Sequence, residues 1–179
     1  QTIATFPHFL SWVLVASLFF NIFGNYGLIN SIIVKFGGSE ISFFASSGWF
    51  RFILIISYVW KEIGWDSIVF YAILCGINTS LFDAAKIDGA TRLDIIRYIK
   101  IPALKKIIIA MLLLQVGSIF TTGFSQIYNL YNPTVYGAAD VLETFIYRNS
   151  FISVSNYGTS VAASLIKTVL NIIFLSAIA

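Results

Sequence analysis

The stretch TSLFDAAKIDGATRLDIIRYIKIPALKK (residues 79–106) joins two long apolar runs and carries six of the eleven cations of the 179-residue chain, against three acidic residues. The rest of the chain therefore has no net charge. A short loop rich in Lys and Arg between membrane spans stays in the cytoplasm. We therefore predict that residues 79–106 are cytoplasmic and that the runs on either side cross a membrane.

The composition of the chain supports a membrane protein. Hydrophobic residues make up 58% of it and charged residues 11%, whereas a soluble domain carries roughly 25% charged residues. Disordered chains and coiled coils need more charge, and the few cations cannot form a nucleic-acid-binding surface. One cysteine and one histidine exclude an internal disulfide and a His/Cys metal cluster. We expect a lipid bilayer as partner, no nucleic acid, and no metal or other cofactor on this chain.

Four runs approach the ~20 apolar residues of a transmembrane helix. They are residues 9–24, 49–78, 107–124 and 157–179. The second run is too long for one straight span and has charged residues near its middle, so we predict a single helix that tilts, bends or borders water. Pro102 precedes the third run, and proline suits the first turn of a helix. The predicted fold is an all-α polytopic membrane protein in which residues 25–48 and 125–156 are extracytoplasmic.

Within the cytoplasmic stretch we predict two short helices joined by a turn. Ser80 and Asp83, and likewise Thr91 and Asp94, have the spacing of a capping box, in which a hydroxyl and a carboxylate satisfy free N–H groups at a helix start. Gly89 between them adopts positive φ easily and ends the first helix. The resulting elbow has too many apolar residues for a solvated loop. The residues alone leave open whether it packs against its own bundle or docks to a partner.

The same stretch carries a motif of a known family. Residues 83–90 (DAAKIDGA), followed after eight residues by 99–102 (IKIP), resemble the E-A-A…D-G-A…I-x-L-P signature of permease subunits of bacterial ABC importers. Asp83 stands where the family usually has Glu, and Ile101 where it usually has Leu. The resemblance covers the whole chain and is strongest to carbohydrate permeases, among them those for oligosaccharides and uronate-type sugars. Its softer parts are residues 6–12 (FPHFLSW), 60–65 (WKEIGW) and 123–133 (GFSQIYNLYNP).

The resemblance implies that residues 1–179 are part of a type I ABC importer transmembrane domain, with the last four of six core helices. Residues 79–101 would be the coupling elbow that seats in a cleft of a separate ATPase subunit. Its implied contact residues are Asp83, Ala84, Ala85, Asp88, Gly89 and Ala90. The implied partners are two ATPase subunits that bind ATP and Mg²⁺, a second, homologous and distinct permease, an extracellular solute-binding protein and an oligosaccharide substrate. The implied location is the bacterial cytoplasmic membrane.

Charged and aromatic residues of the second run are candidates for a substrate cavity. A charge on the lipid face at mid-bilayer costs roughly 2.5–3.5 kcal/mol, so we expect Lys61, Glu62 and Asp66 to face the bundle or water. At helical spacing Tyr58, Glu62 and Trp65 share a stripe, and Lys61 lies four residues before Trp65, a spacing that allows a cation–π contact. Aromatic faces with a few polar groups suit a sugar ring. A structural ion pair, or a span shifted toward the interface, is the alternative.

Three other features complete the candidate sites. Gln115, Ser118 and Thr122 share one face of the third run, which we interpret as cavity lining, with helix packing as the alternative. His8, beside Pro7, is interpreted as a structural histidine rather than a ligand. The tyrosine-rich loop 125–156 either receives a solute-binding protein or forms an interfacial aromatic belt.

The chain contains neither the G-x-x-x-x-G-K-[ST] motif of nucleotide-binding loops nor the G-x-S-x-G motif of serine hydrolases. We therefore predict a transporter subunit without catalytic residues, with ATP hydrolysed by another subunit. Two rival functions stay open. One is an ABC permease for a non-sugar solute, and the other is a membrane scaffold or sensor whose elbow recruits a cytoplasmic partner.

Overall fold

The computed structural model describes residues 2–117, 123–152 and 157–178, and within these ranges it contains helices and connections but no strand. In chain order the elements are α1 (Thr2–Thr5), η1 (Phe6–Phe9), α2 (Trp12–Phe23), α3 (Leu28–Lys35), α4 (Ser47–Cys75), α5 (Thr79–Ile87), α6 (Arg92–Ile95), η2 (Ile96–Lys100), α7 (Ile101–Gly117), α8 (Phe124–Leu130), η3 (Pro133–Val135), α9 (Tyr136–Ala139), α10 (Leu142–Tyr147), η4 (Arg148–Ile152) and α11 (Tyr157–Ile178). The elements η1 and η3 are 3₁₀ turns, and η2 and η4 are π-helical turns. The predicted all-α fold is confirmed.

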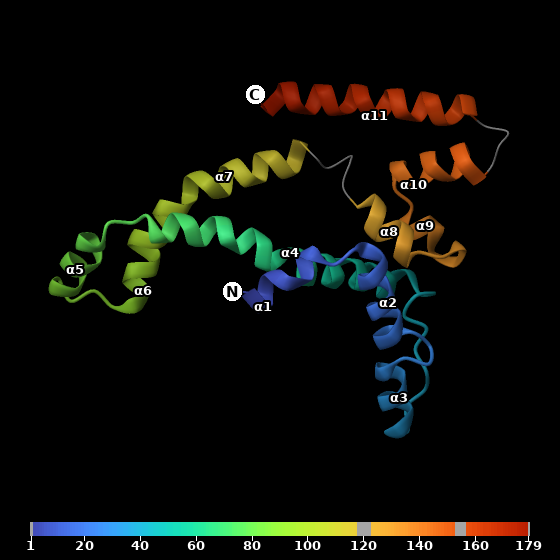
Figure 1. The fold of residues 1–179 in the computed structure, drawn as a ribbon, viewed down its shortest axis with the longest axis horizontal. Helices are drawn as coiled ribbons and strands as arrows, with labels where there is room; N and C mark the ends of the chain where they lie inside the picture. The colour runs from blue at the N-terminus through green and yellow to red at the C-terminus, as the bar shows by residue number, and fades with distance from the viewer. Residues whose placement is uncertain (1, 118–122, 153–156, 179) are drawn as a thin grey trace.

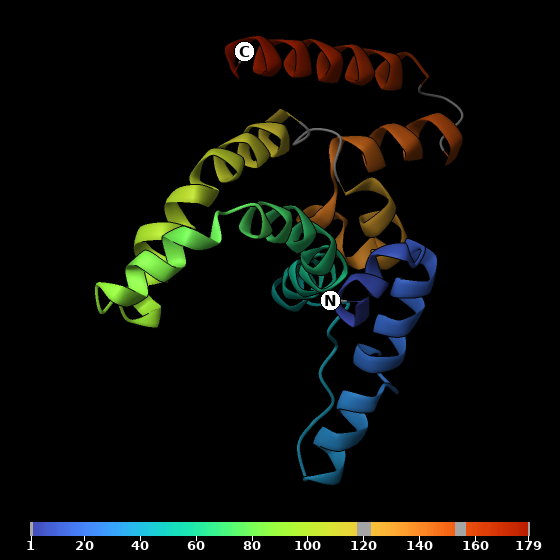
Figure 2. The same cartoon turned by 60° about the vertical axis from the view of Figure 1, so that its left-hand side comes forward.

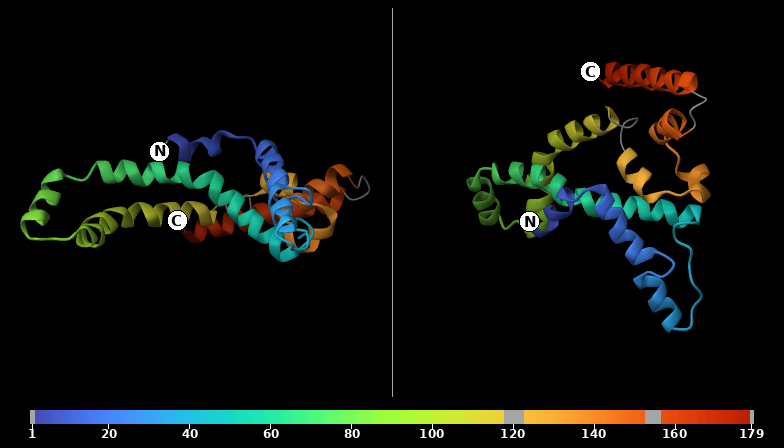
Figure 3. Two further views of the ribbon diagram at one scale, coloured as in Figure 1. Left: turned by 90° about the horizontal axis from the view of Figure 1, so that it is seen from below. Right: turned by 45° about the vertical axis from the view of Figure 1, so that its right-hand side comes forward.

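Two long helices joined by an elbow form one side of the molecule. α4 is a single helix of 29 residues, and α7 runs back beside it from the elbow that α5 and α6 make (Figure 1). α5 bends away from α4 by 70°, and seen from below the two long arms lie side by side (left panel of Figure 3). The prediction of a single helix across the second apolar run is confirmed.

The second arm, α7, differs from the prediction that Pro102 marks the start of a helix. The helix does not begin there, because it runs without a break from Arg92 to Gly117 through the π-helical turn η2. Proline lacks an N–H, and its ring clashes with the carbonyl group four residues earlier in a regular α-helix. The wider π turn immediately before Pro102 relieves this conflict, so the helix continues through the proline.

The N-terminal helices form a rod that projects from α4 (Figure 2). α2 and α3, separated by a short turn, make one apolar stretch of 24 residues, Trp12–Lys35. The predicted first run, residues 9–24, covers α2, and the apolar stretch is longer than predicted because it continues through α3 into the predicted loop 25–48. The apolar residues of α3 continue the stretch beyond residue 24.

The chain after α3 returns beside it toward α4, and Asn30 holds the two segments together. The Asn30 side chain is buried and donates hydrogen bonds to the carbonyl oxygens of Gly24 (3.1 Å) and Ile41 (2.9 Å). Its Oδ1 accepts a hydrogen bond from the N–H of Ile41 at 2.9 Å. A buried amide with all these partners fixes the register of the returning segment.

The described residues contain two helical stretches that are long and apolar enough to cross a membrane, Trp12–Lys35 and Tyr157–Ser176. A third is present if α4 and α5 count as one bent span. The predicted single helix in the last run is confirmed as α11, and its role as a span stays a prediction. The predicted span over residues 107–124 includes residues 118–122, which lie outside the described part of the chain.

The hydrophobic core lies where α2 meets the start of α4 and the segment from α8 to α9. Its buried members are Val15, Ala16, Phe19, Phe43, Phe44, Phe50, Ile53, Leu130, Val135 and Ala139. By contrast, α7 and α11 leave most of their large apolar side chains exposed. Helices that are apolar all round are typical of membrane spans, whose neighbours are lipid or other spans.

Candidate functional site

Both helices of the elbow begin at identifiable caps. Thr91 and Asp94 form the predicted capping box, with the Thr91 Oγ1 accepting from the N–H of Asp94 and the Asp94 carboxylate accepting from the N–H of Thr91 at 2.9 Å. The predicted Ser80–Asp83 box is wrong. Asn78 caps α5 instead, accepting from the N–H of Ser80 at 3.0 Å, and Asp83 forms an ion pair with Lys86 at 3.2 Å.

The turn between the two helices depends on Gly89. Its φ is +75°, as predicted for a residue that ends α5 in the left-handed region. The N–H of Gly89 donates to the carbonyl of Lys86, and the N–H of Ala90 donates to the carbonyl of Ala85. These bonds satisfy the last carbonyl groups of α5 and set the direction in which the chain leaves it.

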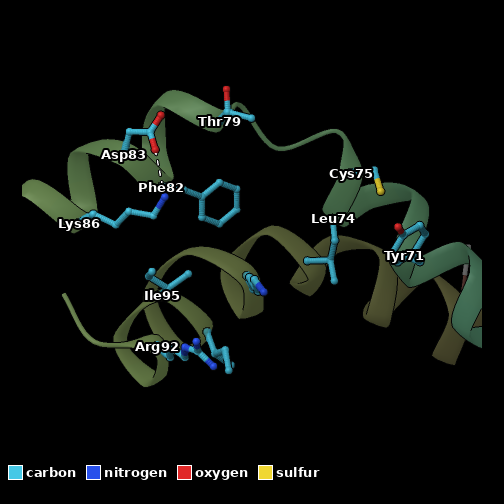
Figure 4. A pocket seen from close by; sticks show the side chains of 11 residues that line it. Tyr71, Leu74, Cys75, Thr79, Phe82, Asp83, Lys86, Arg92 and Ile95 are labelled. Carbon is cyan, nitrogen blue, oxygen red and sulfur yellow. Dashed lines mark hydrogen bonds and ion pairs between the residues drawn. The ribbon is translucent and has the colours of Figure 1, made fainter.

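α5 has two different faces. Thr79, Phe82, Asp83 and Lys86 lie on one face and line a pocket of about 670 Å³ between α5, the end of α4 and α6 (Figure 4). Among the other predicted coupling residues, Ala84, Asp88 and Gly89 are exposed, while Ala85 and Ala90 are half-buried, and none of the five lines that pocket.

The described part of the chain does not cover the elbow. α5 buries none of its residues, and two large apolar side chains of the elbow, Ile87 and Leu93, are 86% and 75% exposed. Such an exposed apolar surface on a short amphipathic helix is typical of a site that docks to another protein.

The second candidate site is a partly buried ionic cluster halfway along α4. Lys61 is only 5% exposed and its Nζ donates to the carbonyl oxygen of His8. The His8 Nδ1 lies 2.6 Å from the Glu62 Oε2, and Lys61 Nζ lies 3.6 Å from the other oxygen of Glu62. The cluster joins η1 to α4, and the expected structural role of His8 is confirmed.

The aromatic contacts of this cluster differ from the prediction. The expected cation–π contact of Lys61 with Trp65 is wrong, because Lys61 Nζ lies over Trp12, 5.5 Å from the ring centroid. Trp65 instead stacks on the ring of His8, with centroids 4.5 Å apart and planes 5° from parallel. The sequence spacing along α4 gave no information about α2 or η1, which supply the actual partners.

A cavity of about 440 Å³ opens beside this cluster. Residues from four helices line it, namely Trp12, Tyr58, Glu62, Gly123, Phe124, Ser125, Gln126 and Glu143. Tyr58 and Glu62, both predicted to face a cavity, therefore lie together on its wall, and Asp66 lines a smaller pocket next to them. Lys61 and Trp65 line neither of these two pockets.

The second arm, α7, reaches the same region. Gln115 of α7 lies within hydrogen-bonding reach of the Tyr58 hydroxyl, so two of the predicted cavity residues meet across α4 and α7. Ser118 and Thr122, the other two predicted on this face, lie outside the described residues. Gln126 of α8 is buried and donates to the Leu54 carbonyl (2.6 Å) and to Ser57 Oγ (2.8 Å), which fixes α8 on α4.

Sequence reasoning missed Trp12 and Glu143 as cavity residues. Glu143 of α10 borders the cavity and forms an ion pair with Lys167 of α11. The sequence did carry a signal for Glu143. Glu143 and Lys167 are isolated charges in largely apolar segments, and such charges need a partner. Trp12 offered no comparable signal, since tryptophan is common at the ends of membrane helices.

Aromatic side chains cover the segment from α8 to η4. Tyr128 and Tyr147 have ring centroids 4.9 Å apart, and Tyr131 and Tyr136 have centroids 4.8 Å apart. Arg148 lies over the ring of Tyr136 and forms an ion pair with Asp140 at 2.5 Å. The Asp140 carboxylate holds the pKa of Arg148 above its usual range, so this guanidinium stays charged at any physiological pH.

The family model described as "Binding-protein-dependent transport system inner membrane component" matches residues 1–179. The chain belongs to this family. Membership confirms the resemblance seen in residues 83–102 and the location in a membrane. A helical membrane domain of this family explains the four apolar runs and the cationic connection together.

Individual members of the family are similar over almost the whole chain. The polygalacturonan/rhamnogalacturonan transport system permease protein YteP of Bacillus subtilis is 36% identical over 174 residues, which cover 97% of this chain and 54% of that protein. The crystal structure of a bacterial ABC transporter involved in the import of the acidic polysaccharide alginate has a chain that superposes with a TM-score of 0.93 at 36% identity. A crystal structure of the bacterial alginate ABC transporter in complex with the alginate pentasaccharide-bound periplasmic protein gives a TM-score of 0.91, also at 36% identity.

The chain spans only part of these relatives. It corresponds to 54% of YteP and to 62% of the chain in each alginate transporter structure, while 99% of its own residues are covered in both structures.

Proposed function

We propose that this chain is the part of an ABC importer permease that holds the coupling elbow and one wall of the path for an acidic oligosaccharide. The observation that carries the proposal is the elbow, in which two helices joined by a left-handed glycine stand uncovered at the end of two membrane helices. Family membership supports a role in binding-protein-dependent transport.

The proposed orientation places the elbow on the cytoplasmic side. Residues 79–106 hold most of the cations of the chain, and cationic loops are retained in the cytoplasm. The connection that follows the first apolar stretch, Trp12–Lys35, and residues 125–156 then face the outside. The aromatic and ion-paired segment from α8 to η4 lies on that outer side, where it is suited to contact an extracellular solute-binding protein.

The elbow is the proposed contact with the ATPase subunits. The chain contains no nucleotide-binding motif, so ATP and Mg²⁺ are held by two separate ATPase subunits. Ala84, Asp88 and Gly89 are exposed on the elbow and are the residues proposed to dock. The elbow can take one position in each of two conformations of the permease. Closure of the ATPase subunits shifts the permease toward one conformation only if the closed subunits bind the elbow more tightly in that conformation.

The cavity beside Tyr58 and Glu62 is the proposed sugar site. Trp12, Tyr58 and Phe124 supply aromatic faces, and Ser125, Gln126 and Glu62 supply polar groups, a combination that suits a pyranose ring. Polygalacturonan and alginate, named for the similar transporters, are polymers of uronic acids, so the proposed substrate class is acidic oligosaccharides. A second, homologous permease subunit completes the path.

Uptake by the full-length transporter in proteoliposomes tests this function. We expect import of a labelled oligogalacturonate that requires ATP and the solute-binding protein, with little import of amino acids. Tyr58→Ala should lower uptake at least tenfold, whereas Ile55→Ala, an exposed α4 residue outside the cavities described here, should not. Amino-acid import would indicate a permease for another solute, and purification without any ATPase subunit would indicate a scaffold.

A further inference from the structure

The pocket inside the elbow is the largest cavity described here and is separate from the proposed ATPase contact. It lies between the last turns of α4, the inner face of α5, and α6 with η2, and its volume is about 670 Å³, within the usual range of ligand sites. Leu74 of α4, Phe82 of α5 and Ile95 of α6 point toward its interior (Figure 4). The wall of the pocket is therefore mainly apolar.

The charged side chains that border the pocket are mostly cations. Lys86, Arg92 and Lys100 line it, against the single acidic residue Asp83. Asp83 pairs with Lys86. Among the described residues, neither Arg92 nor Lys100 has an acidic group within ion-pair distance, so the pocket keeps an excess of positive charge next to an apolar wall.

We propose that this pocket binds an anionic phospholipid of the inner leaflet, with the phosphate between Arg92 and Lys100 and the upper acyl chains against Leu74, Phe82 and Ile95. Cationic pockets at the cytoplasmic ends of membrane helices are suited to anionic headgroups. The proposal rests on the proposed function in one respect, namely that the elbow lies at the inner membrane surface.

The lining of the pocket favours an anionic lipid over a segment of the ATPase. Three of its lining residues, Tyr71, Leu74 and Cys75, belong to the last turn of the membrane helix α4. An apolar wall next to unpaired cations matches a phospholipid, which carries an anionic phosphate beside its acyl chains. The ATPase is proposed to contact Ala84, Asp88 and Gly89, which lie outside the pocket, so both partners can bind at once.

A bound lipid would act on the angle of the elbow. α5 bends by 70° from α4 and buries none of its residues in the described structure. A molecule that contacts α4, α5 and α6 at the same time favours one position of α5 relative to the two long helices. Anionic lipid would thereby stabilise the arrangement in which α5 is presented to the ATPase.

The rate at which Cys75 is alkylated reports directly on whether the pocket is occupied. Cys75 is the only cysteine in the 179 residues, it is exposed, and it lines the pocket. The full-length transporter is placed in nanodiscs of phosphatidylcholine with increasing phosphatidylglycerol, and the rate of Cys75 alkylation by N-ethylmaleimide is followed by peptide mass spectrometry. We expect phosphatidylglycerol to slow alkylation severalfold. The variant Arg92→Gln/Lys100→Gln should lose this protection, since each cation removed weakens binding about fivefold, which corresponds to ~1 kcal/mol.

The matched control is Lys105→Gln/Lys106→Gln, which removes the same charge from exposed positions on α7 outside the pocket and should keep the protection. Equal loss in both double variants would show a general surface-charge effect and overturn the proposal, as would equal rates in the two lipids. Protection that is lost when the ATPase subunits are removed from the transporter would assign the pocket to a protein segment, and protection by inorganic phosphate in phosphatidylcholine would assign it to a free anion. None of these outcomes depends on uptake, so the proposed transport function is tested separately.

Discussion

Replacement of Gly89 by Val tests the elbow as a coupling device. Gly89 has φ +75°, and a Cβ built on it meets no atom within 4 Å. A valine side chain therefore has room, and its cost comes from the backbone alone. The left-handed conformation costs an ordinary L-residue ~1–2 kcal/mol, and a β-branched residue tolerates it least. A cost of this size changes the population of the native turn by about 5- to 30-fold.

The strain should appear as a loss of coupling. The carbonyl groups of Ala85 and Lys86 accept hydrogen bonds from the turn, so a change of φ at residue 89 moves α6 relative to α5. We expect sugar uptake per ATP hydrolysed, measured in proteoliposomes, to fall about 5- to 30-fold in Gly89→Val. Gly89→Asn is the matched control, because asparagine adopts the left-handed region more readily, and it should retain most of the coupling. Unchanged coupling in the Val variant, or an equal loss with Asn, would refute the argument.

Three further variants test the packing around the sites. Hydrogen bonds from the Thr91 hydroxyl and N–H hold the pKa of Asp94 below its usual range. The cap should therefore stabilise α6 fully above the ordinary pKa of an aspartate and lose its effect as pH falls through the lower pKa of the folded state. Thr91→Ala should raise the pKa of Asp94 and, at neutral pH, speed hydrogen exchange in residues 92–95 about fivefold. Gly64→Ala should lower the thermal midpoint in detergent because its Cβ would overlap the backbone of α1, whereas Gly48→Ala, with no atom within 4 Å, should leave it equal or higher. Gln126→Leu should cost about 1–3 kcal/mol of stability through two lost hydrogen bonds between α8 and α4, and an unchanged midpoint would contradict the importance of that contact.

The elements that the sequence predicts well are those set by local physics. The capping box at Thr91, the left-handed Gly89 and the single helix across the second apolar run depend on neighbours within a few residues. Pro102 does not mark the start of a helix, although proline is common there. The π turn before it accommodates the proline ring, so the helix continues through this residue. Ser80 failed as a cap because α5 begins earlier, at Thr79, where Asn78 accepts from the N–H of Ser80, so that Ser80 lies inside the first turn.

The candidate sugar site is predicted only in part because its walls come from distant segments. Tyr58 and Glu62 share a helical stripe and do meet at one cavity. The spacing along α4 suggested a cation–π contact between Lys61 and Trp65. Lys61 instead contacts the ring of Trp12, which lies on another helix and which that spacing could not indicate. Likewise the charges of Lys61 and Glu62 were visible, but His8, which bonds to both residues, is separated from them by more than fifty residues.

The two sites lie on one uninterrupted helix, and this arrangement relates them mechanically. Glu62 at the cavity and Cys75 at the elbow are thirteen residues apart on α4, about 20 Å at 1.5 Å per residue, with no break between them. The other arm differs, because it contains a π turn followed by Pro102 just beyond the elbow, and such turns are where helices bend. A force on α5 would therefore turn α4 as a rod while the second arm yields at η2. The displacement would reach the cavity mainly through Tyr58 and Glu62, and the buried contacts of Lys61 with His8 would carry it on to η1 and α2.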